Sequence, residues 1–419
     1  MSKRYSALTL ARHALQPDLA WPKAWERREP RASYDIVIIG GGGHGLATAY
    51  YLARNHGITN VAVLERSYIG SGNVGRNTTL IRSNYVIDGN TQFFEHSLKL
   101  WEGLSHELNF NCMVSQRGQI VLAVNPGQLD VFARRGNIMR LNGIDAELLD
   151  RGEVMKLLPY LDYSKEARWP IWGGILQGRA GTVRHDAVAW GYARAASRLG
   201  VHIIENCEVT GFVMEGGAAV GVETTRGRIN AGKIGIAVAG HSSHVAAMAG
   251  LRLPIESHIL QAFVTEPIKP IVHHVVSWGA ELFYLSQSDK GGLVFGGHID
   301  GFNTYTQRGQ FSRIQTVAEC AVSLMPFMSR LRLLRHWGGI QDMTPDGSPF
   351  ICRTPVRNLY LNGGWCYQGF KATPASGWTF AHTIAHDEEH DLNRCYSLDR
   401  FRQGRELDDY GIGNWTYKQ

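Results

Sequence analysis

A cluster of glycines close to the N-terminus carries the clearest chemical signal in this chain of 419 residues. Gly40, Gly42 and Gly45 are separated by one and two residues, the spacing of a dinucleotide-binding turn. The first glycine permits a sharp bend, the second lets backbone N–H groups reach a pyrophosphate, and the third lets a helix pack on the strand. Gly43 and His44 belong to the same turn. The spacing predicts a dinucleotide site, for a nicotinamide or a flavin cofactor.

An acid and a polar loop follow the glycine turn and support the same interpretation. Glu65 ends a short apolar run 20 residues after Gly45, where a carboxylate can accept a hydrogen bond from a ribose hydroxyl. The loop 66–79 then contains mostly small and polar residues. A loop that leaves the second strand of a nucleotide-binding fold faces the ligand. We therefore expect its donors to reach the cofactor, namely Asn73, Arg76, Asn77 and Thr78.

Two cations occur where they could bind a substrate carboxylate. Arg82 follows two apolar residues, and a guanidinium can hold a carboxylate through two parallel hydrogen bonds. Lys371 follows Gly369, in a segment where a strand runs into Gly364 and a loop leads to a helix expected after Pro374. Each cation also has another interpretation. Arg82 could form a structural ion pair, and Lys371 could be an exposed lysine or a charge beside the cofactor.

Two histidines stand near the start of expected helices. His185 precedes Asp186, an acid that favours the first turn of a helix, and local pattern alone makes this histidine a capping or surface residue. His241 follows the apolar run Lys233–Gly240. That run repeats the order of strand, glycine and helix seen at the N-terminus, so it predicts a return to the nucleotide-binding sheet.

The order of elements predicts an α/β fold in which a Rossmann-like nucleotide-binding domain is interleaved with an antiparallel-sheet substrate domain. Strand-like segments at 253–266, 282–286 and 293–297 suggest the antiparallel sheet. The predicted divisions are an N-terminal arm at 1–32, a discontinuous nucleotide-binding domain at 33–110, 176–250 and 335–390, a substrate or partner domain at 111–175 and 251–334, and a C-terminal tail at 391–419.

Composition excludes several other classes of protein. The formal net charge is +6, but residues 1–32 alone hold seven Lys and Arg against three acids, so a nucleic-acid-binding face is not expected. The six cysteines are scattered, which argues against a zinc site or a disulfide framework and favours a reducing compartment. We expect no bound metal. No apolar run approaches the roughly 20 residues of a membrane span, so we expect a cytoplasmic protein with no membrane partner.

Several longer motifs resemble one flavoprotein family over nearly the whole chain. The chain resembles the β subunits of bacterial heterotetrameric sarcosine oxidases, within the glycine/D-amino-acid oxidase group. The resembling segments are Gly40–Ala53, Gly75–Thr79, Ser97–Glu102, Arg184–Trp190, Asn206–Gly211 and Gly369–Pro374.

The resemblance implies two flavins and three partner subunits. FAD would bind non-covalently at the glycine turn, and FMN would be attached covalently to His185 at the interface with the α subunit, with γ and δ subunits completing the heterotetramer. His241 would contact the FMN. The FAD contacts implied by the resemblance are Gly43, His44, Glu65, Asn73, Arg76, Thr78, Val209, Gly369 and Lys371.

The resemblance also implies oxidative N-demethylation of a small N-methyl amino acid, with sarcosine as the expected substrate and glycine as product. The methyl carbon would leave as formaldehyde or pass to tetrahydrofolate, and electrons would move from FAD to FMN to dioxygen. Arg82 and Lys371 would hold the substrate carboxylate. No residue is expected to act as a general base.

One departure from the family pattern keeps alternatives open. The usual loop is Trp-Gly-Thr-Gly-Gly-Phe-Lys, whereas this chain has Cys366, Tyr367 and Gln368 between Trp365 and Gly369. The added bulk and polarity make an N-methylglutamate dehydrogenase subunit with a non-oxygen acceptor an alternative. A monomeric amine oxidase is another, although such enzymes carry a flavin-bearing cysteine that is missing before Thr344. The third alternative is a non-catalytic flavin scaffold.

Overall fold

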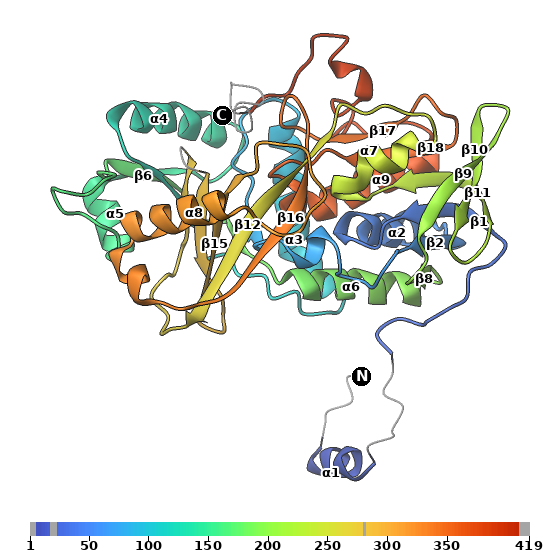
Figure 1. Cartoon of the computed structure of the whole chain (residues 1–419), viewed down its shortest axis with the longest axis horizontal. Helices are drawn as coiled ribbons and strands as arrows, with labels where there is room; N and C mark the ends of the chain where they lie inside the picture. Colours follow the sequence, from blue (N-terminus) through green and yellow to red (C-terminus); the bar gives the residue numbers. More distant parts are fainter. Residues whose placement is uncertain (1–5, 17–22, 280–281, 410–419) are drawn as a thin grey trace.

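The computed structural model describes residues 6–16, 23–279 and 282–409. Figure 1 shows two lobes side by side, each built around an eight-stranded sheet. The helix α1 (Ala7–Leu15) lies away from both lobes. No helix among the described residues is long and apolar enough to cross a membrane. The predicted α/β class is confirmed.

The first sheet is the nucleotide-binding type. Strands β18, β11, β1, β2 and β8 run parallel, and β17 pairs antiparallel with β18 at one edge. The hairpin of β9 and β10 pairs with β11. In sheet order the strands are β17 (Phe350–Arg353), β18 (Leu359–Gly363), β11 (Ile229–Ile236), β1 (Ser33–Ile39), β2 (Val61–Leu64) and β8 (His202–Ile204), with β9 (Val209–Glu215) and β10 (Ala218–Thr224) beside them.

Both faces of this sheet are covered, which explains why β1 is apolar without alternation. Ile36 and Ile38 point into a core shared with four helices, whereas Val37 and Ile39 point into a second core with β9, β10 and α7. The helices on the first face are α2 (Gly43–His56), α3 (Asn90–Glu107), α6 (His185–Arg198) and α9 (Gly369–His386), and α7 spans Ser242–Ala247.

The second sheet is antiparallel except where β13 runs parallel to β4. Helices α5 and α8 share its core, and α4 packs on β6. In order the strands are β16 (Leu333–Met343), β12 (Glu256–Pro267), β15 (Gly292–Ile299), β14 (Phe283–Gln287), β13 (Val275–Trp278), β4 (Gln119–Ala123), β6 (Gly173–Gln177) and β5 (Glu147–Asp150), and the helices are α4 (Pro126–Leu141), α5 (Arg151–Leu157) and α8 (Phe311–Leu324).

Two expected domain divisions fall inside strands of the second sheet. The division at residues 175/176 lies within β6, and the division at 334/335 lies within β16. Strand β16 pairs with β12 from Leu333 to Met343, so the chain leaves the second sheet only after Met343.

The expectation that the last helix begins after Pro374 is wrong, because α9 begins at Gly369 and contains Pro374. Proline supplies no N–H to a helix. Side chains of α3 support the same region of α9: Ser97 Oγ and Trp101 Nε1 donate to the Lys371 carbonyl at 2.7 and 2.9 Å. Lys371 therefore sits in the first turn of a helix and not in a loop.

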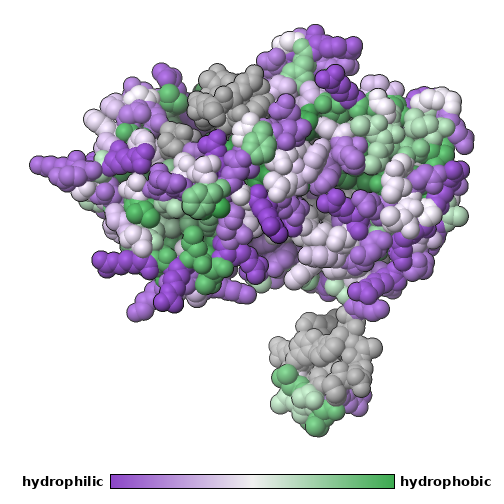
Figure 2. All heavy atoms as spheres, in the orientation of Figure 1, coloured by the Kyte–Doolittle hydropathy of each residue, from purple (hydrophilic) through white to green (hydrophobic). Residues whose placement is uncertain are grey.

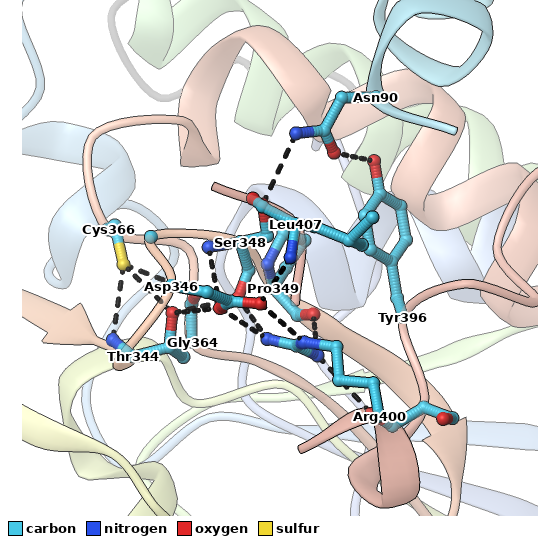
Figure 3. A network of polar contacts seen from close by, with 12 residues as sticks. Asn90, Thr344, Asp346, Ser348, Pro349, Gly364, Cys366, Tyr396, Arg400 and Leu407 are labelled. Atoms are coloured by element: carbon cyan, nitrogen blue, oxygen red, sulfur yellow. Dashed lines mark hydrogen bonds and ion pairs between the residues drawn. The ribbon is translucent and has the colours of Figure 1, made fainter. Parts of the chain in front are cut away.

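A buried ion pair connects the C-terminal segment to the turn that follows β16 (Figure 3). Arg400 donates to both carboxylate oxygens of Asp346, at 2.7 and 2.8 Å, and also to the carbonyls of Ser348 and Pro349. Burial alone would raise the pKa of Asp346, but the Arg400 guanidinium outweighs it and the pKa is lowered. The Leu407 N–H donates to the same carboxylate at 3.0 Å.

The turn that Arg400 contacts also makes hydrogen bonds to the segment after β18. Thr344 donates its hydroxyl to the Ser348 carbonyl at 2.8 Å and its N–H to Cys366 Sγ at 3.2 Å (Figure 3). Tyr396, also in the C-terminal segment, donates to Asn90 Oδ1 at 2.8 Å. The segment 391–409 is thus packed into the fold, while the rest of the expected tail, 410–419, lies outside the described residues.

We expect Arg400→Met to lower the free energy of unfolding by about 3–5 kcal/mol, because it leaves a buried carboxylate without its cation. Arg402→Met is the control, since Arg402 pairs with Asp399 on the surface, where an ion pair contributes about 0–1 kcal/mol. Because the folded pKa of Asp346 is lowered, the contribution is present above about pH 4 and is lost as the pH falls through that pKa. Chemical denaturation of both variants at neutral pH measures the difference, and equal small losses would contradict the role of Arg400.

Candidate active site

A cavity of about 920 Å³ collects residues from both sheets and from the loops between them. Its volume is near the top of the range of about 300–1,000 Å³ for small-molecule sites, which suits a large ligand. Most residues expected from the sequence line it: Gly40, Gly42, Gly43, His44, Glu65, Asn73, Arg76, Asn77, Thr78, Arg82, Val209, His241, Gly369 and Lys371. Gly45, Gly364 and His185 are not among the lining residues.

The glycine turn has the geometry of a phosphate cradle. Gly40 has a φ of +107°, and a Cβ on Gly45 would lie 2.0 Å from the Gly40 carbonyl oxygen, so both positions require glycine. A Cβ on Gly42 would instead meet nothing within 4 Å. Gly42 precedes the first residue of α2 without a side-chain cap. The uncapped N–H groups of α2 therefore face open cavity space that fits an anionic group.

Glu65 is held at the same end of the cavity by backbone donors. Its Oε2 accepts from the Gly41 N–H at 2.9 Å, and its Oε1 accepts from the Ser67 N–H at 2.9 Å. These bonds fix the carboxylate between the glycine turn and the loop that follows β2 (Val61–Leu64). Glu65 therefore lies directly beside the glycine turn.

The loop 66–79 is docked on β16 of the second sheet. Asn73 accepts from the Ile340 N–H at 3.1 Å and also donates to the Ile340 carbonyl, while the Arg76 carbonyl accepts from Trp337 Nε1 at 2.7 Å. Within the described residues, the buried Nε of Arg76 makes no hydrogen bond. A donor left unpaired on a cavity wall is a ready contact for a ligand.

Arg82 and Lys371 reach the cavity from different elements. Arg82 follows β3 (Leu80–Ile81), and its guanidinium lies over the Tyr85 ring, 5.0 Å from the centroid. Lys371 is buried, so its interpretation as an exposed lysine is wrong. Its Nζ donates to the Tyr367 carbonyl at 2.6 Å. Burial and the charge of Arg82 lower the pKa of Lys371 well below its usual value, so an arriving anion would favour its charged form.

His44 supports this wall as a neutral ring. It stacks on Trp365 with ring centroids 4.5 Å apart, and its Nδ1 lies 2.6 Å from Ser376 Oγ. Burial lowers the pKa of His44 to about 3, against an opposing backbone contact at Gly369. The stack fixes Trp365, the first residue of the loop that departs from the family pattern.

The departing residues do not all face the cavity. Cys366 and Tyr367 line it, whereas Gln368 donates its Nε2 to the Gly347 carbonyl at 2.9 Å. Cys366 is buried and has a φ of +49°, and burial raises the pKa of its thiol to about 12. A neutral thiol and a tyrosine therefore stand where the family pattern has small residues.

His185 and His241 occupy different surroundings. His185 begins α6, which packs against the short helix η1 (Asn73–Gly75), and in the described part of the chain its buried Nδ1 has no hydrogen-bond partner. Burial lowers the pKa of His185 despite the Asp186 carboxylate beside it, so the ring is neutral. His241 lines the cavity with its Nε2 3.3 Å from Arg66 Nη1, and burial followed by that cation lowers its pKa to about 4.

A two-stranded ladder connects Arg82 with the helix of His185. Strand β3 pairs antiparallel with β7 (Gly181–Thr182), and the Val183 N–H donates to the Thr79 carbonyl at 2.9 Å. Arg82 follows one strand and α6 follows the other. The loop 66–79 lines the cavity and also packs on α6, so it lies between His185 and the cavity. The ladder holds Arg82 and the start of α6 in fixed positions relative to each other.

Sequence reasoning missed several cavity residues. Asp342 is buried at the end of β16, and its Oδ2 accepts from the Gly364 N–H at 2.6 Å. Burial raises the pKa of this carboxyl to about 6, although backbone N–H donors oppose the shift. Because β16 also contains other charged and polar residues, no local pattern singles out Asp342. Tyr284 and Trp278 line the cavity from β14 and β13, and only the pairing of the second sheet places them there.

Comparison with known proteins gives the family. A family model described as FAD dependent oxidoreductase matches residues 35–383. The chain is 60% identical over 410 residues to sarcosine oxidase subunit beta of Rhizobium meliloti, covering 98% of each chain. It is 51% identical over 387 residues to sarcosine oxidase subunit beta of an Arthrobacter species, covering 92% of this chain and 96% of the relative.

Solved structures agree on the fold. The L-proline dehydrogenase of P. horikoshii matches with a TM-score of 0.83 and 29% identity over 90% of this chain and 100% of that one. A glycine oxidase of Geobacillus kaustophilus matches with a TM-score of 0.79, covering 88% of this chain and 99% of that one, and at 22% identity it shows the fold alone.

The chain belongs to the FAD-dependent oxidoreductase family, and it is a flavin-dependent oxidoreductase. Within that family it is similar over nearly its whole length to sarcosine oxidase β subunits, which confirms the resemblance predicted from the motifs. The open cradle at Gly42 fits an anionic group such as the pyrophosphate of FAD, and the Nε of Arg76, unpaired among the described residues, is a donor available on the same cavity wall.

We expect Gly42→Ala to weaken FAD binding at least about tenfold, a change of about 1.4 kcal/mol, because its methyl group enters the open space before α2. Gly103→Ala is the control, since its Cβ also meets nothing within 4 Å but lies on the exposed side of α3. FAD titration of the apoprotein gives both affinities, and thermal melting of the apoproteins confirms that both variants fold. Unchanged affinity in Gly42→Ala would contradict the cradle.

Proposed function

We propose that this chain is the substrate-oxidising subunit of a sarcosine oxidase. It would convert sarcosine to glycine and release the methyl carbon as formaldehyde or pass it to tetrahydrofolate. The observation that carries the proposal is that Arg82 and Lys371 both line the cavity that the glycine turn also lines. The names of the most similar relatives support the same substrate.

The two cations define how the substrate would bind. A carboxylate placed between Arg82 and Lys371 gains charge-assisted hydrogen bonds, and it restores the charge that burial disfavours on Lys371. The same cations disfavour a third positive charge, so the substrate amine would bind neutral and release its proton to solvent. This arrangement needs no general base. FAD, when bound, supplies the acceptor for the hydride of the N-methyl carbon.

We further propose that His185 carries a covalent FMN, with electrons passing from FAD to FMN and on to dioxygen. Three features support this assignment: burial lowers the pKa of the imidazole, its Nδ1 lacks a hydrogen-bond partner in the described residues, and the loop 66–79 lies between it and the cavity. A neutral imidazole nitrogen is the form that can bond to a flavin carbon. The position also suits a second flavin near the first without sharing its cavity.

Partner subunits follow from the same comparison. Relatives named as β subunits imply other chains, and we propose α, γ and δ subunits. Figure 2 shows apolar side chains gathered on the lobe of the second sheet. Exposed apolar residues there include Phe311 and Val322 of α8 and Leu333 and Leu334 of β16. Contiguous exposed apolar groups are typical of subunit contacts.

A second candidate substrate is N-methylglutamate, because the cavity wall contains further cations besides Arg82 and Lys371. Arg135 of α4 lines the cavity with Gln119 and Gln177, although it also donates to the Asn84 carbonyl at 2.6 Å and lies 3.9 Å from Asp409. A second carboxylate could bind there. Steady-state turnover with both amino acids, with dioxygen and with an artificial acceptor, separates the two. Preference for N-methylglutamate together with negligible peroxide would replace the sarcosine oxidase assignment.

We expect Arg82→Met to lower kcat/KM for sarcosine by about 10–100-fold, because it removes a hydrogen bond to a charged group that contributes about 1.5–3 kcal/mol. Arg228→Met is the control, since Arg228 forms an exposed ion pair with Glu223 outside the cavity. Oxygen consumption by the complete complex measures the effect, and the FAD content of each variant shows that the site is intact. Equal kcat/KM in the two variants would exclude the carboxylate role.

We expect acid precipitation to release FAD and to leave FMN on the peptide that contains His185. Peptide mass mapping of the pellet locates the attachment, and His185→Asn, which retains FAD, should yield a colourless pellet. A colourless pellet from the unmodified protein would rule out the covalent FMN, whereas flavin on another peptide would move the attachment away from His185.

A further inference from the structure

Three histidines meet at the far ends of two helices that form the cavity. His56 is the last residue of α2, and His382 and His386 lie one turn apart near the end of α9. One ring nitrogen from each lies within 4.8 Å of the others. The ring centroids of His382 and His386 are 4.5 Å apart, and those of His56 and His386 are 5.1 Å apart.

These groups have the chemistry of a transition-metal site. Neutral imidazole is a preferred ligand of zinc, and three histidines with a fourth, exchangeable position form a common zinc ligand set. The C-terminal ends of α2 and α9 add negative dipole ends, which favour a bound cation.

The ligand atoms need only a small movement to bind one ion. Two nitrogens that are each about 2.0–2.1 Å from zinc can be at most about 4.2 Å apart. The nitrogens here lie within 4.8 Å of one another, and His386 is exposed, so its side chain can rotate without disturbing a packed core. Side-chain rotation therefore suffices to close the site.

We propose that His56, His382 and His386 bind one zinc-like divalent ion that links the C-terminal ends of α2 and α9. The two helices pack against each other (Figure 1). Gly43 and Lys371, at their N-terminal ends, line the cavity. Since α2 has 14 residues and α9 has 18, the ion lies about 20–27 Å from that cavity. The ion would join the two helices whose other ends line the cavity.

The sequence alone did not suggest this site. His382 and His386 have a spacing that places both on one face of a helix, but a pair is weak evidence. The third ligand is more than 300 residues away in the chain, and only the packing of α2 on α9 brings it near. The proposal is independent of the substrate and of the second flavin.

The test is zinc titration of the untagged full-length protein, loaded with flavin, after removal of metal by a chelator. A chromophoric chelator competes for Zn²⁺ and gives the affinity, and Co²⁺ absorption reports the coordination number. We expect one ion per chain and a melting temperature that rises with zinc concentration.

Two variants make the titration specific. His386→Gln removes an exposed ligand and should weaken binding more than about 100-fold, because even groups that only support metal ligands contribute about 10–100-fold. His273→Ala removes an exposed histidine elsewhere and should bind zinc as the unmodified protein does. Flavin absorbance shows that each variant is folded. No zinc binding by the unmodified protein, or equal affinity in His386→Gln, would overturn the proposal.

Discussion

Positive charge around one cavity is the constraint on which this structure depends. The N-terminal ends of α2 and α9 reach its wall, Arg82 and Lys371 add two side-chain cations, and the Nε of Arg76 is left as an unpaired donor. These donors and cations favour anionic or electron-rich ligands. In the proposed function, the pyrophosphate of FAD would bind at the glycine turn, and the substrate carboxylate would bind beside Lys371.

The fold supplies this wall from segments that are distant in sequence. Asn73 and the Arg76 carbonyl fasten the loop after β2 to β16 of the other sheet, so the two lobes share one cavity. The ladder of β3 and β7 fixes Arg82 on the cavity side and α6 on the other. Arg400 secures the turn after β16, whose Thr344 contacts Cys366. Each of these connections is made by hydrogen bonds between different elements, and such bonds are directional, whereas hydrophobic packing is not.

Local patterns predicted the parts of the site whose geometry is local. The three glycines are predictable because each meets a local requirement: Gly40 makes the turn, Gly42 leaves the cradle open and Gly45 allows the helix contact. Glu65 is predictable from its separation from them along the sequence. Pro374 predicts the start of a helix and so places Lys371 in a loop, whereas α9 includes that proline and is supported by side chains of α3. Asp342, Tyr284 and the cluster of His56 depend on contacts between elements, which spacing in the sequence does not encode.

The requirement for a substrate anion can be measured by anaerobic reduction of the flavin in the complete complex. Sarcosine and its carboxyl-neutral analogue N-methylglycinamide present the same N-methyl amine and differ in charge at the position assigned to Arg82 and Lys371. Rapid bleaching of the FAD absorbance by sarcosine and slow or negligible bleaching by the amide is the predicted result. Equal rates of bleaching at matched concentrations would contradict an anion-binding cavity.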